Sequence, residues 1–241
     1  MFPVLQYHVK LFAISDLHLS FGTNKPMDLF GDHWTNYEQR IRDDWNARVG
    51  ADDVVIVAGD ISWAMRMEDT AADFAYIKAL AGTKIIVRGN HDYWWKSISK
   101  IREVFAPDTY ALQNDAVKIG NIVFAGTRGW HVPERRETPD AEDTKIYNRE
   151  VIRFELALKD AKTKMSDGDK LVAILHYPPF NAMQDPSPFT ELCEKYGVAV
   201  CVYGHLHGKT GRMVTLVEKN GVKYYLTSCD ILKHTLVEIE I

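Results

Sequence analysis

Five short apolar runs in this chain are each followed by side chains that can bind a divalent metal. The runs cover residues 11–14, 54–58, 85–87, 171–175 and 198–203. The segments that follow them are Asp16-Leu17-His18, Gly59-Asp60, Gly89-Asn90-His91-Asp92, His176 and Gly204-His205-Leu206-His207. Such runs are typical of buried strands in a parallel or mixed sheet, and these sheets bind ligands beyond the carboxyl ends of their strands. The sequence therefore predicts one metal site at one edge of the fold.

The donor atoms at these positions indicate the class of metal. The predicted ligands offer only oxygen and nitrogen, and they are Asp16, His18, Asp60, Asn90, His176, His205 and His207. This set suits manganese or iron, with zinc or nickel as alternatives, and differs from the thiolate ligands of most structural zinc sites. Seven ligands are too many for one ion that keeps an open catalytic position. We therefore expect two divalent ions, which in such sites lie roughly 3.5–4 Å apart and act on phosphate esters.

Helical and strand-like segments alternate along most of the chain. Helical spacing of apolar residues predicts helices over 37–49, 69–80, 94–105 and 144–165. The alternation continues to about residue 205 and indicates βαβ units. Beyond it, 213–217 and 222–226 flank an Asn-Gly turn, which predicts a hairpin, and 235–241 predicts a last strand. The expected architecture is α/β, with two packed mixed β-sheets flanked by helices in a single domain over 1–241.

Bulk composition excludes several classes of protein. The chain has 241 residues, 46% hydrophobic and 26% charged, and a net charge of -4, which argues against non-specific binding to nucleic acid or an anionic membrane. No apolar stretch approaches the roughly 18 residues of a membrane-spanning helix, and residues 1–7 lack the pattern of a secretory signal. Cysteines 193, 201 and 229 have no metal-binding spacing and predict free thiols. We expect a cytoplasmic protein.

The ordered set of motifs resembles the calcineurin-like metallophosphoesterases. The pattern D-x-H, G-D, G-N-H-D, H and G-H-x-H is met in order between residues 16 and 207. One of these motifs alone would carry little weight, whereas the ordered five are specific. The resemblance implies a four-layer α/β/β/α sandwich. It also implies an enzyme that hydrolyses a phosphomonoester or phosphodiester of a small substrate by attack of a metal-bridging hydroxide.

The resemblance also assigns a role to each motif residue. Asp16, His18 and His207 would bind the first ion, and Asn90, His176 and His205 the second. Asp60 would bridge the two ions. His91 would face the substrate phosphate, steady the transition state and protonate the leaving oxygen. Asp92 would shape this loop and orient His91.

Outside the motifs, one loop and several aromatic residues are candidates for substrate binding. The polar segment Thr127–Asp143 lacks periodicity and follows a predicted strand at 122–125. Within it, Arg128 is a candidate phosphate clamp and Trp130 a candidate wall of the cleft. Trp63 and Trp94 are weaker candidates for the same wall. The four histidines outside the motifs are expected at the surface or in loops, at positions 8, 33, 131 and 234.

Two branches of the superfamily fit poorly. Residues 59–65 lack the second aspartate and the arginine of serine/threonine protein phosphatases, and Trp63 stands where purple acid phosphatases have a tyrosine ligand. The chain resembles the bacterial-type phosphohydrolase branch instead. The alternatives left open are a non-catalytic scaffold with the same fold, a nuclease, and a pyrophosphatase acting on nucleotides or lipid precursors. Nucleic acid is an unexpected partner, and the oligomeric state stays open.

Overall fold

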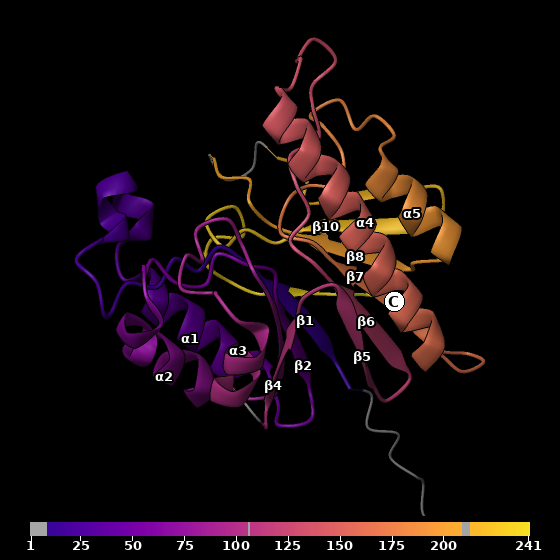
Figure 1. Ribbon diagram of the computed structural model, residues 1–241. Helices are drawn as coiled ribbons and strands as arrows, with labels where there is room; N and C mark the ends of the chain where they lie inside the picture. The colour runs from indigo at the N-terminus through magenta and orange to yellow at the C-terminus, as the bar shows by residue number, and fades with distance from the viewer. Residues whose placement is uncertain (1–8, 106, 209–212) are drawn as a thin grey trace, which may run out of the picture.

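The computed structural model describes residues 9–105, 107–208 and 213–241, and within them the strands form two mixed sheets packed face to face (Figure 1). Residues 1–7, on which the expectation of no secretory signal rests, and His8 lie outside the described residues. The first sheet has the order β11-β1-β2-β3-β4, and all its neighbours are parallel except β11 and β1. Its strands are β1 (Leu11–Ile14), β2 (Val54–Val57), β3 (Thr83–Val87), β4 (Thr109–Leu112) and β11 (Val237–Glu238).

The second sheet has the order β5-β6-β7-β8-β10-β9, with antiparallel pairs at its two edges and parallel pairs between them. Its strands are β5 (Asp115–Ile119), β6 (Ile122–Gly126), β7 (Lys170–Ile174), β8 (Val200–Tyr203), β9 (Leu216–Lys219) and β10 (Val222–Leu226). The predicted C-terminal hairpin is therefore present as β9 and β10, although β9 begins at Leu216.

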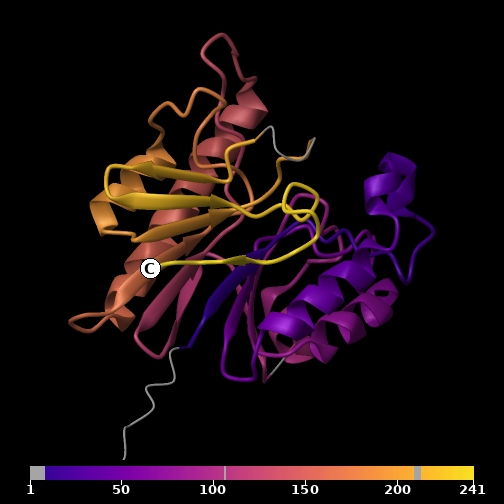
Figure 2. The same cartoon turned by 180° about the vertical axis from the view of Figure 1, so that it is seen from behind.

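Helices cover the outer face of each sheet and complete four layers. The helices against the first sheet are α1 (Tyr37–Arg48), α2 (Ala71–Ala79) and α3 (Ile98–Phe105), and those against the second are α4 (Ala141–Lys164) and α5 (Pro188–Tyr196). Figure 2 shows the same layers from behind, with the two helical groups on opposite sides of the paired sheets. The expected α/β/β/α sandwich is confirmed.

Burial on both faces explains why the strands are continuously apolar. In β1, Phe12 and Ile14 enter the core beneath α1–α3, while Leu11 and Ala13 enter the core between the sheets. Successive side chains of a strand point to opposite faces, so a strand covered on both sides must be apolar throughout. The second sheet divides its residues in the same way between the inter-sheet core and the core beneath α4 and α5.

Two helices begin several residues away from their predicted starts, and three elements were not predicted. Helix α3 begins at Ile98 and not at Trp94, because Trp94 and Trp95 lie in a turn and are almost fully buried. Helix α4 begins at Ala141, where the Asp140 side chain accepts a hydrogen bond from the Asp143 N–H, so the loop is three residues shorter than expected. Helix α5 and strands β4 and β5 were not predicted.

Three short 3₁₀ segments lie among the loops, and they are η1 (Met27–Phe30), η2 (Asp32–Trp34) and η3 (Met67–Thr70). The segment with η1 extends beyond the rest of the fold on the side of the first sheet (Figure 1). Within the described residues, no helix combines the length and the apolar character needed to cross a membrane.

Candidate metal centre

The predicted ligands lie beyond the carboxyl ends of five strands, as the sequence predicts. Asp16 and His18 follow β1, Asp60 follows β2, and Asn90 follows β3. His176 follows β7, and His205 and His207 follow β8. The first sheet thus supplies four of the seven predicted ligands and the second sheet supplies three.

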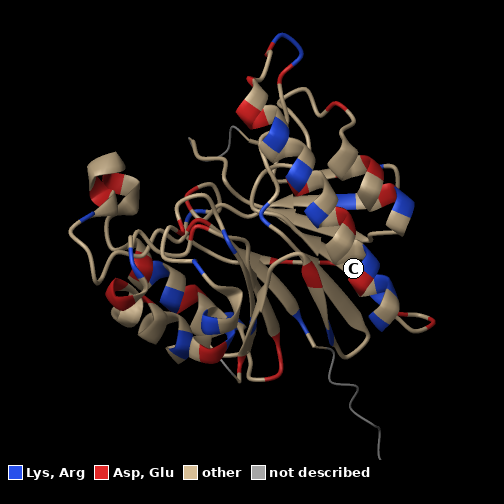
Figure 3. Cartoon of the chain, viewed as in Figure 1, with Lys and Arg blue, Asp and Glu red and all other residues tan. Residues whose placement is uncertain are grey.

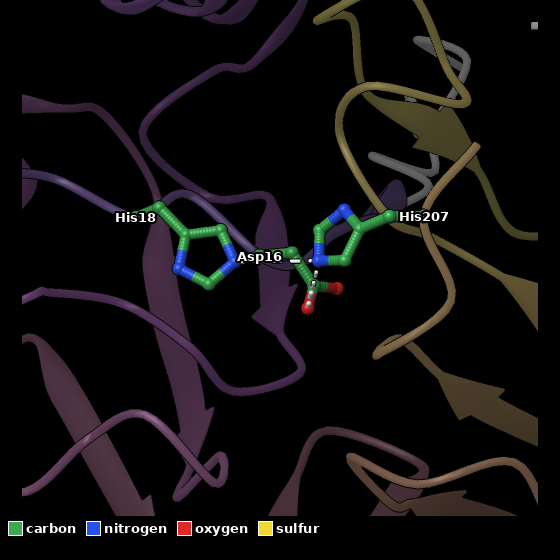
Figure 4. Close-up of side chains that lie close together, drawn as sticks. All are labelled: Asp16, His18 and His207. Atoms are coloured by element: carbon green, nitrogen blue, oxygen red, sulfur yellow. Dashed lines mark hydrogen bonds and ion pairs between the residues drawn. The ribbon is translucent and has the colours of Figure 1, made fainter. Parts of the chain in front are cut away.

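The first cluster contains Asp16, His18 and His207, and its ligand atoms lie within 4.8 Å of one another. Figure 4 shows the Asp16 carboxylate between the rings of His18 and His207, which come from distant parts of the chain. The two Nε2 atoms of these histidines are 3.3 Å apart, and His207 Nε2 is 3.5 Å from Asp16 Oδ1. Two imidazole nitrogens this close to a carboxylate require a proton or a cation between them.

The second cluster surrounds the side-chain oxygen of Asn90. The Asn90 Oδ1 atom is 2.7 Å from His176 Nε2 and 2.9 Å from His205 Nδ1. His176 Nδ1 is 3.0 Å from the Ala58 carbonyl oxygen, which fixes the N–H on that nitrogen. In a neutral His176 the Nε2 atom then presents a lone pair to the Asn90 oxygen, and a cation satisfies both.

Asp60 lies between the two clusters. Its Oδ1 atom accepts a hydrogen bond of 2.8 Å from the His91 N–H. Its Oδ2 atom is buried without a hydrogen-bond partner among the described residues, at 3.9 Å from His18 Nε2 and 3.5 Å from His176 Nε2. A buried carboxylate oxygen left without a partner is costly. Its place between a nitrogen of each cluster fits a bridging metal ligand, and Asp16, Asp60 and His176 also form a set that could hold an ion.

The backbone holds several ligands in a rarely used conformation. Asp16, His18, Asp60 and His205 have φ values of 58°, 46°, 51° and 72°. Residues other than glycine seldom adopt this left-handed region, and such strain concentrates at functional sites. The tips of β1 and β2 are joined by hydrogen bonds from Asp16 N to the Gly59 oxygen and from His18 N to the Asp60 oxygen, both 3.0 Å long. These bonds keep the ligands in place.

Glycines precede the ligands because the backbone passes very close to neighbouring side chains. A Cβ atom at Gly89 would overlap Asp60, and one at Gly204 would overlap the side chains of Ser15 and Asp16. Any larger residue at either position would displace a predicted ligand. The glycines of the second, third and fifth motifs are therefore part of the site geometry.

A further set of polar groups holds the ligands from behind. The Ser228 hydroxyl donates to Asp16 Oδ2 at 3.0 Å, and the His205 N–H donates to the same oxygen at 2.9 Å. His207 Nδ1 is 3.1 Å from Asp230 Oδ1. Ser228 and Asp230 lie in the turn after β10 and were not among the predicted site residues. Only their position after a strand could have indicated them, because they belong to none of the five motifs.

Burial and neighbouring charges prepare these groups for cation binding. Burial lowers the pKa of His18 to about 3 and that of His205 to about 4, so both present free lone pairs at neutral pH. Burial, with the negative charges of Asp16 and Asp92, raises the pKa of Asp60 well above its usual value. Burial alone would lower the pKa of His207, but its contacts with Asp16 and Asp230 raise it to about 10. In the absence of metal, a proton on His207 therefore takes the place of a cation.

His91 and Asp92 have different surroundings. His91 is half-buried at the edge of the cleft described below, next to Trp63 at 4.5 Å between ring centroids. Asp92 is fully buried and accepts hydrogen bonds from the N–H groups of Ile61, Ser62 and Gly89 and from the Trp94 indole. These bonds connect the loop after β3 to the loop after β2. The arrangement agrees with the expectation that Asp92 shapes the loop that carries His91. Among the described residues, the hydrogen bonds of Asp92 go to backbone N–H groups and to the Trp94 indole, and none goes to the His91 ring. The Nδ1 atom of His91 has no hydrogen-bond partner there.

Arg128 and Trp130 lie beside the second cluster. The Arg128 guanidinium stacks over the Trp130 ring at 4.6 Å, and its Nη2 is 3.6 Å from Glu150 Oε1. Trp130 contacts Tyr177 at 5.3 Å, and Tyr177 packs against His205 at 4.2 Å, both between ring centroids. The two candidate residues therefore approach the site through Tyr177.

A large cleft opens in front of the first cluster. Its volume is about 910 Å³, and its floor includes His18, His91 and His207. The aromatic and apolar wall is formed by Met27, Phe30, Trp34 and Trp63. The expectation that Trp63 walls the cleft agrees with this arrangement. Trp94 does not reach the cleft, because it is fully buried against Phe74 and Trp95.

Two residues were misread or missed around this wall. Trp34, to which the sequence analysis gave no role, lies in η2 and lines the cleft. His234, expected at the surface, is 1% exposed and packs against Trp34 at 4.9 Å between ring centroids. Neither position could be predicted, because short 3₁₀ segments and turns carry no regular apolar spacing.

Comparison with known proteins identifies the family. The model of the calcineurin-like phosphoesterases matches residues 9–209. The chain belongs to this family. The match over most of the chain makes it a metal-dependent phosphoester hydrolase. Membership of the family implies divalent metal ions as cofactors, and the two Asp/His clusters are groups that could hold them. No curated protein matches the chain at a significant level.

Solved structures share the fold at low sequence identity. The phosphopantetheinyl hydrolase of Mycobacterium tuberculosis is 15% identical, with a TM-score of 0.58 and 95% of each chain covered. The protein TT1561 of Thermus thermophilus is 12% identical, with a TM-score of 0.53 and coverage of 96% of this chain and 98% of that one. A protein of unknown function from Aquifex aeolicus, AQ665, is 15% identical, with a TM-score of 0.51 and 96% of each chain covered. At these identities the likeness concerns the fold alone.

Proposed function

We propose that this chain is a dinuclear phosphoesterase that cleaves a P–O bond of a small organic phosphate with water. The observation that carries the proposal is the position of Asp60 Oδ2, which is buried, unpartnered among the described residues, and located between His18 Nε2 and His176 Nε2. Asp16, His18 and His207 would hold one ion, and Asn90, His176 and His205 the other, with Asp60 shared between them.

The donor set supports manganese or iron as the native metals, with zinc or nickel as alternatives, because it combines carboxylates, imidazoles and an amide without thiolate. Two divalent ions held there would supply positive charge for the phosphate and lower the pKa of water. The free lone pairs of His18 and His205 fit this role, since burial lowers the pKa of both rings.

We assign the proton transfer to His91. Its ring lies at the floor of the cleft, and burial lowers its pKa, so the neutral ring carries one N–H and one lone pair at pH 7. The N–H of the neutral ring can donate a hydrogen bond to a phosphate oxygen. The negative charge of a bound phosphate favours the imidazolium form, which would give one proton to the leaving oxygen and return to the neutral ring. A positioned general acid contributes about 10²–10⁴-fold in rate. Asp92 acts as a positioning residue, because its carboxylate holds the backbone on which His91 is carried.

The cleft defines the kind of alcohol that leaves. Trp63, next to His91 at 4.5 Å between ring centroids, lines the cleft together with Phe30, and the Lys25 amine lies 4.6 Å over the Trp63 ring. This wall favours a flat or apolar organic group next to the phosphate.

A second candidate is a pyrophosphatase acting on an amphipathic precursor. Such an enzyme needs an apolar segment above the site, and the polar loop Thr127–Asp143 offers little of that. The segment Met27–Trp34 supplies it instead, because Met27, Phe30 and Trp34 line the cleft and Phe30 is 67% exposed. The scaffold alternative loses support, because all seven predicted ligands converge. A nuclease would need a basic groove, which the net charge of -4 does not favour.

The proposal is tested by an activity screen of metal-free protein supplemented with Mn²⁺, Fe²⁺, Zn²⁺, Ni²⁺ or Mg²⁺, using generic mono- and diesters and a pyrophosphate diester. Asp60→Asn should lose one of two bound ions and most turnover, and His91→Ala should lose about 10²–10⁴-fold in kcat with its metal content unchanged. Matched controls are Asp52→Asn, an exposed carboxylate, and His131→Ala, which pairs only with Glu137 at the surface. Wild-type rates in both site variants would refute the assignment.

A further inference from the structure

Besides the aromatic cleft, a polar cavity lined by arginines lies on the same rim as the metal centre. It has a volume of about 270 Å³. The guanidinium groups of Arg88, Arg128, Arg149 and Arg153 line it, together with Glu150 and neutral residues of 112–114 and 127. We call this cavity the arginine pocket. Figure 3 shows that basic residues recur along α4, the helix that supplies Arg149 and Arg153.

The charges of the arginine pocket do not balance within the protein. Glu150 is 1% exposed, and its Oε1 atom lies 2.7 Å from Arg153, 3.5 Å from Arg149 and 3.6 Å from Arg128. One carboxylate therefore contacts three guanidinium groups, and a fourth arginine, Arg88, lines the same cavity. The Nε atom of Arg88 is also buried without a hydrogen-bond partner among the described residues. The pocket holds an excess of about three positive charges and an unused donor.

The pocket is connected to the metal centre through the backbone. Arg88 directly precedes Gly89-Asn90-His91, the loop that carries a predicted ligand and the proton donor. The carbonyl oxygen of Arg128 accepts hydrogen bonds from the N–H groups of His176, at 2.9 Å, and Tyr177, at 3.1 Å. The pocket thus adjoins the second cluster, whereas the aromatic cleft adjoins the first.

Guanidinium groups bind phosphate-type oxyanions through two parallel N–H···O bonds, and like charges in one cavity favour an anion that separates them. A cavity of about 270 Å³ has room for such a group with its water. We propose that the arginine pocket is a second oxyanion site that binds a phosphate group separate from the one that is hydrolysed. The group is either a second phosphate of the substrate, an assignment that rests on the proposed function, or free phosphate.

The first experiment measures binding without catalysis. Inorganic phosphate is titrated by calorimetry into protein kept metal-free with a chelator, so that failure of the proposed hydrolysis leaves the result interpretable. Arg149→Gln/Arg153→Gln should weaken phosphate binding at least about tenfold, because each lost charge-assisted pair contributes substantially to affinity. Lys159→Gln/Lys162→Gln, which removes the same charge from the same helix outside the pocket, should leave binding unchanged.

Stability of the variants is checked by thermal unfolding. If the double variant does not fold, Arg149→Gln alone replaces it, since this side chain is 47% exposed and contacts Glu150 at 3.5 Å. No binding of phosphate to the wild-type protein, or equal binding by the pocket variant and the lysine control, would overturn the proposal.

The second experiment distinguishes the two sources of the phosphate. Metal-loaded enzyme is assayed with butyl phosphate and with butane-1,4-diyl bisphosphate. If the substrate supplies the second phosphate, the pocket variant should raise KM for the bisphosphate about tenfold or more and leave butyl phosphate unaffected. If free phosphate is the ligand, the variant should treat both substrates alike, while phosphate binding to the metal-free protein is still lost.

Discussion

The hydrogen bonds of Asp92 lead to a specific prediction. The sequence indicates that Asp92 orients His91, whereas the structure places the Asp92 carboxylate among backbone N–H donors. Its Oδ1 atom accepts from Ile61 N at 2.8 Å, Ser62 N at 3.2 Å and the Trp94 indole at 3.1 Å. Its Oδ2 atom accepts from Gly89 N at 2.7 Å. We expect Asp92→Asn to destabilise the protein even when no metal is bound.

The magnitude follows from the geometry. An asparagine can keep its oxygen toward the three donors at Oδ1, but its NH₂ group then faces the Gly89 N–H as donor against donor. The loss of one charge-assisted hydrogen bond and the buried, unsatisfied N–H together cost about 2–4 kcal/mol. For a domain of this size, 1 kcal/mol shifts Tm by about 2–4 °C, so the expected decrease is about 4–16 °C.

The assay is thermal unfolding in the presence of a chelator, with Asp52→Asn as the matched control, since Asp52 is exposed and should change stability by less than about 0.5 kcal/mol. Activity is measured in parallel with metal content. A Tm equal to that of the control, combined with a large loss of kcat, would refute the structural role. It would indicate instead that Asp92 acts in the chemical step.

Three further predictions concern the rim and the cleft. Gly204→Ala should place a methyl group against Asp16. The substitution should lower the free energy of unfolding by about 1–3 kcal/mol and reduce the metal content. A normal metal content would contradict this geometry. Metal binding at pH 8 should release a proton from His207, whose pKa is about 10 in the metal-free protein, so affinity should rise with pH up to that value. Calorimetry in buffers of different ionisation enthalpy detects this release, and identical heats would argue against it. Phe30→Ala should raise KM for aryl phosphates about tenfold, whereas Leu29→Ala, its more exposed neighbour outside the cleft lining, should not; equal KM values for the two variants would exclude Phe30 from the substrate wall.

The convergence of the proposed metal ligands could be predicted because parallel strands place their carboxyl ends at one edge. His176 and Arg128 illustrate this, since β6 and β7 run in register and bring the residues after them side by side. The apolar runs before each motif were long enough to indicate strands, and the spacing within each motif named the side chains. Together these two local signals determined most of the site.

The remainder depends on contacts that no local pattern records. Asp230 reaches His207 from a turn 23 residues away, and its sequence neighbours show no periodicity. By their apolar spacing, Trp94 and Trp95 look like the start of the helix that follows. In the structure they precede that helix, and their indole N–H groups donate hydrogen bonds to Asp92 and Gln113. Helix α5 was missed although its Ser187-Pro188 start and Gly197 end are strong local signals, because it is only 9 residues long.

The division of the seven ligands between the sheets has a mechanical consequence. One ion would be held by Asp16 and His18 from one layer and His207 from the other, and the second ion by Asn90 from one layer and a pair of histidines from the other. Each cation would therefore cross-link the two sheets of the sandwich. We expect the supply of metal in the cell to set how long the folded chain survives, since a species that binds only the native state protects it from unfolding.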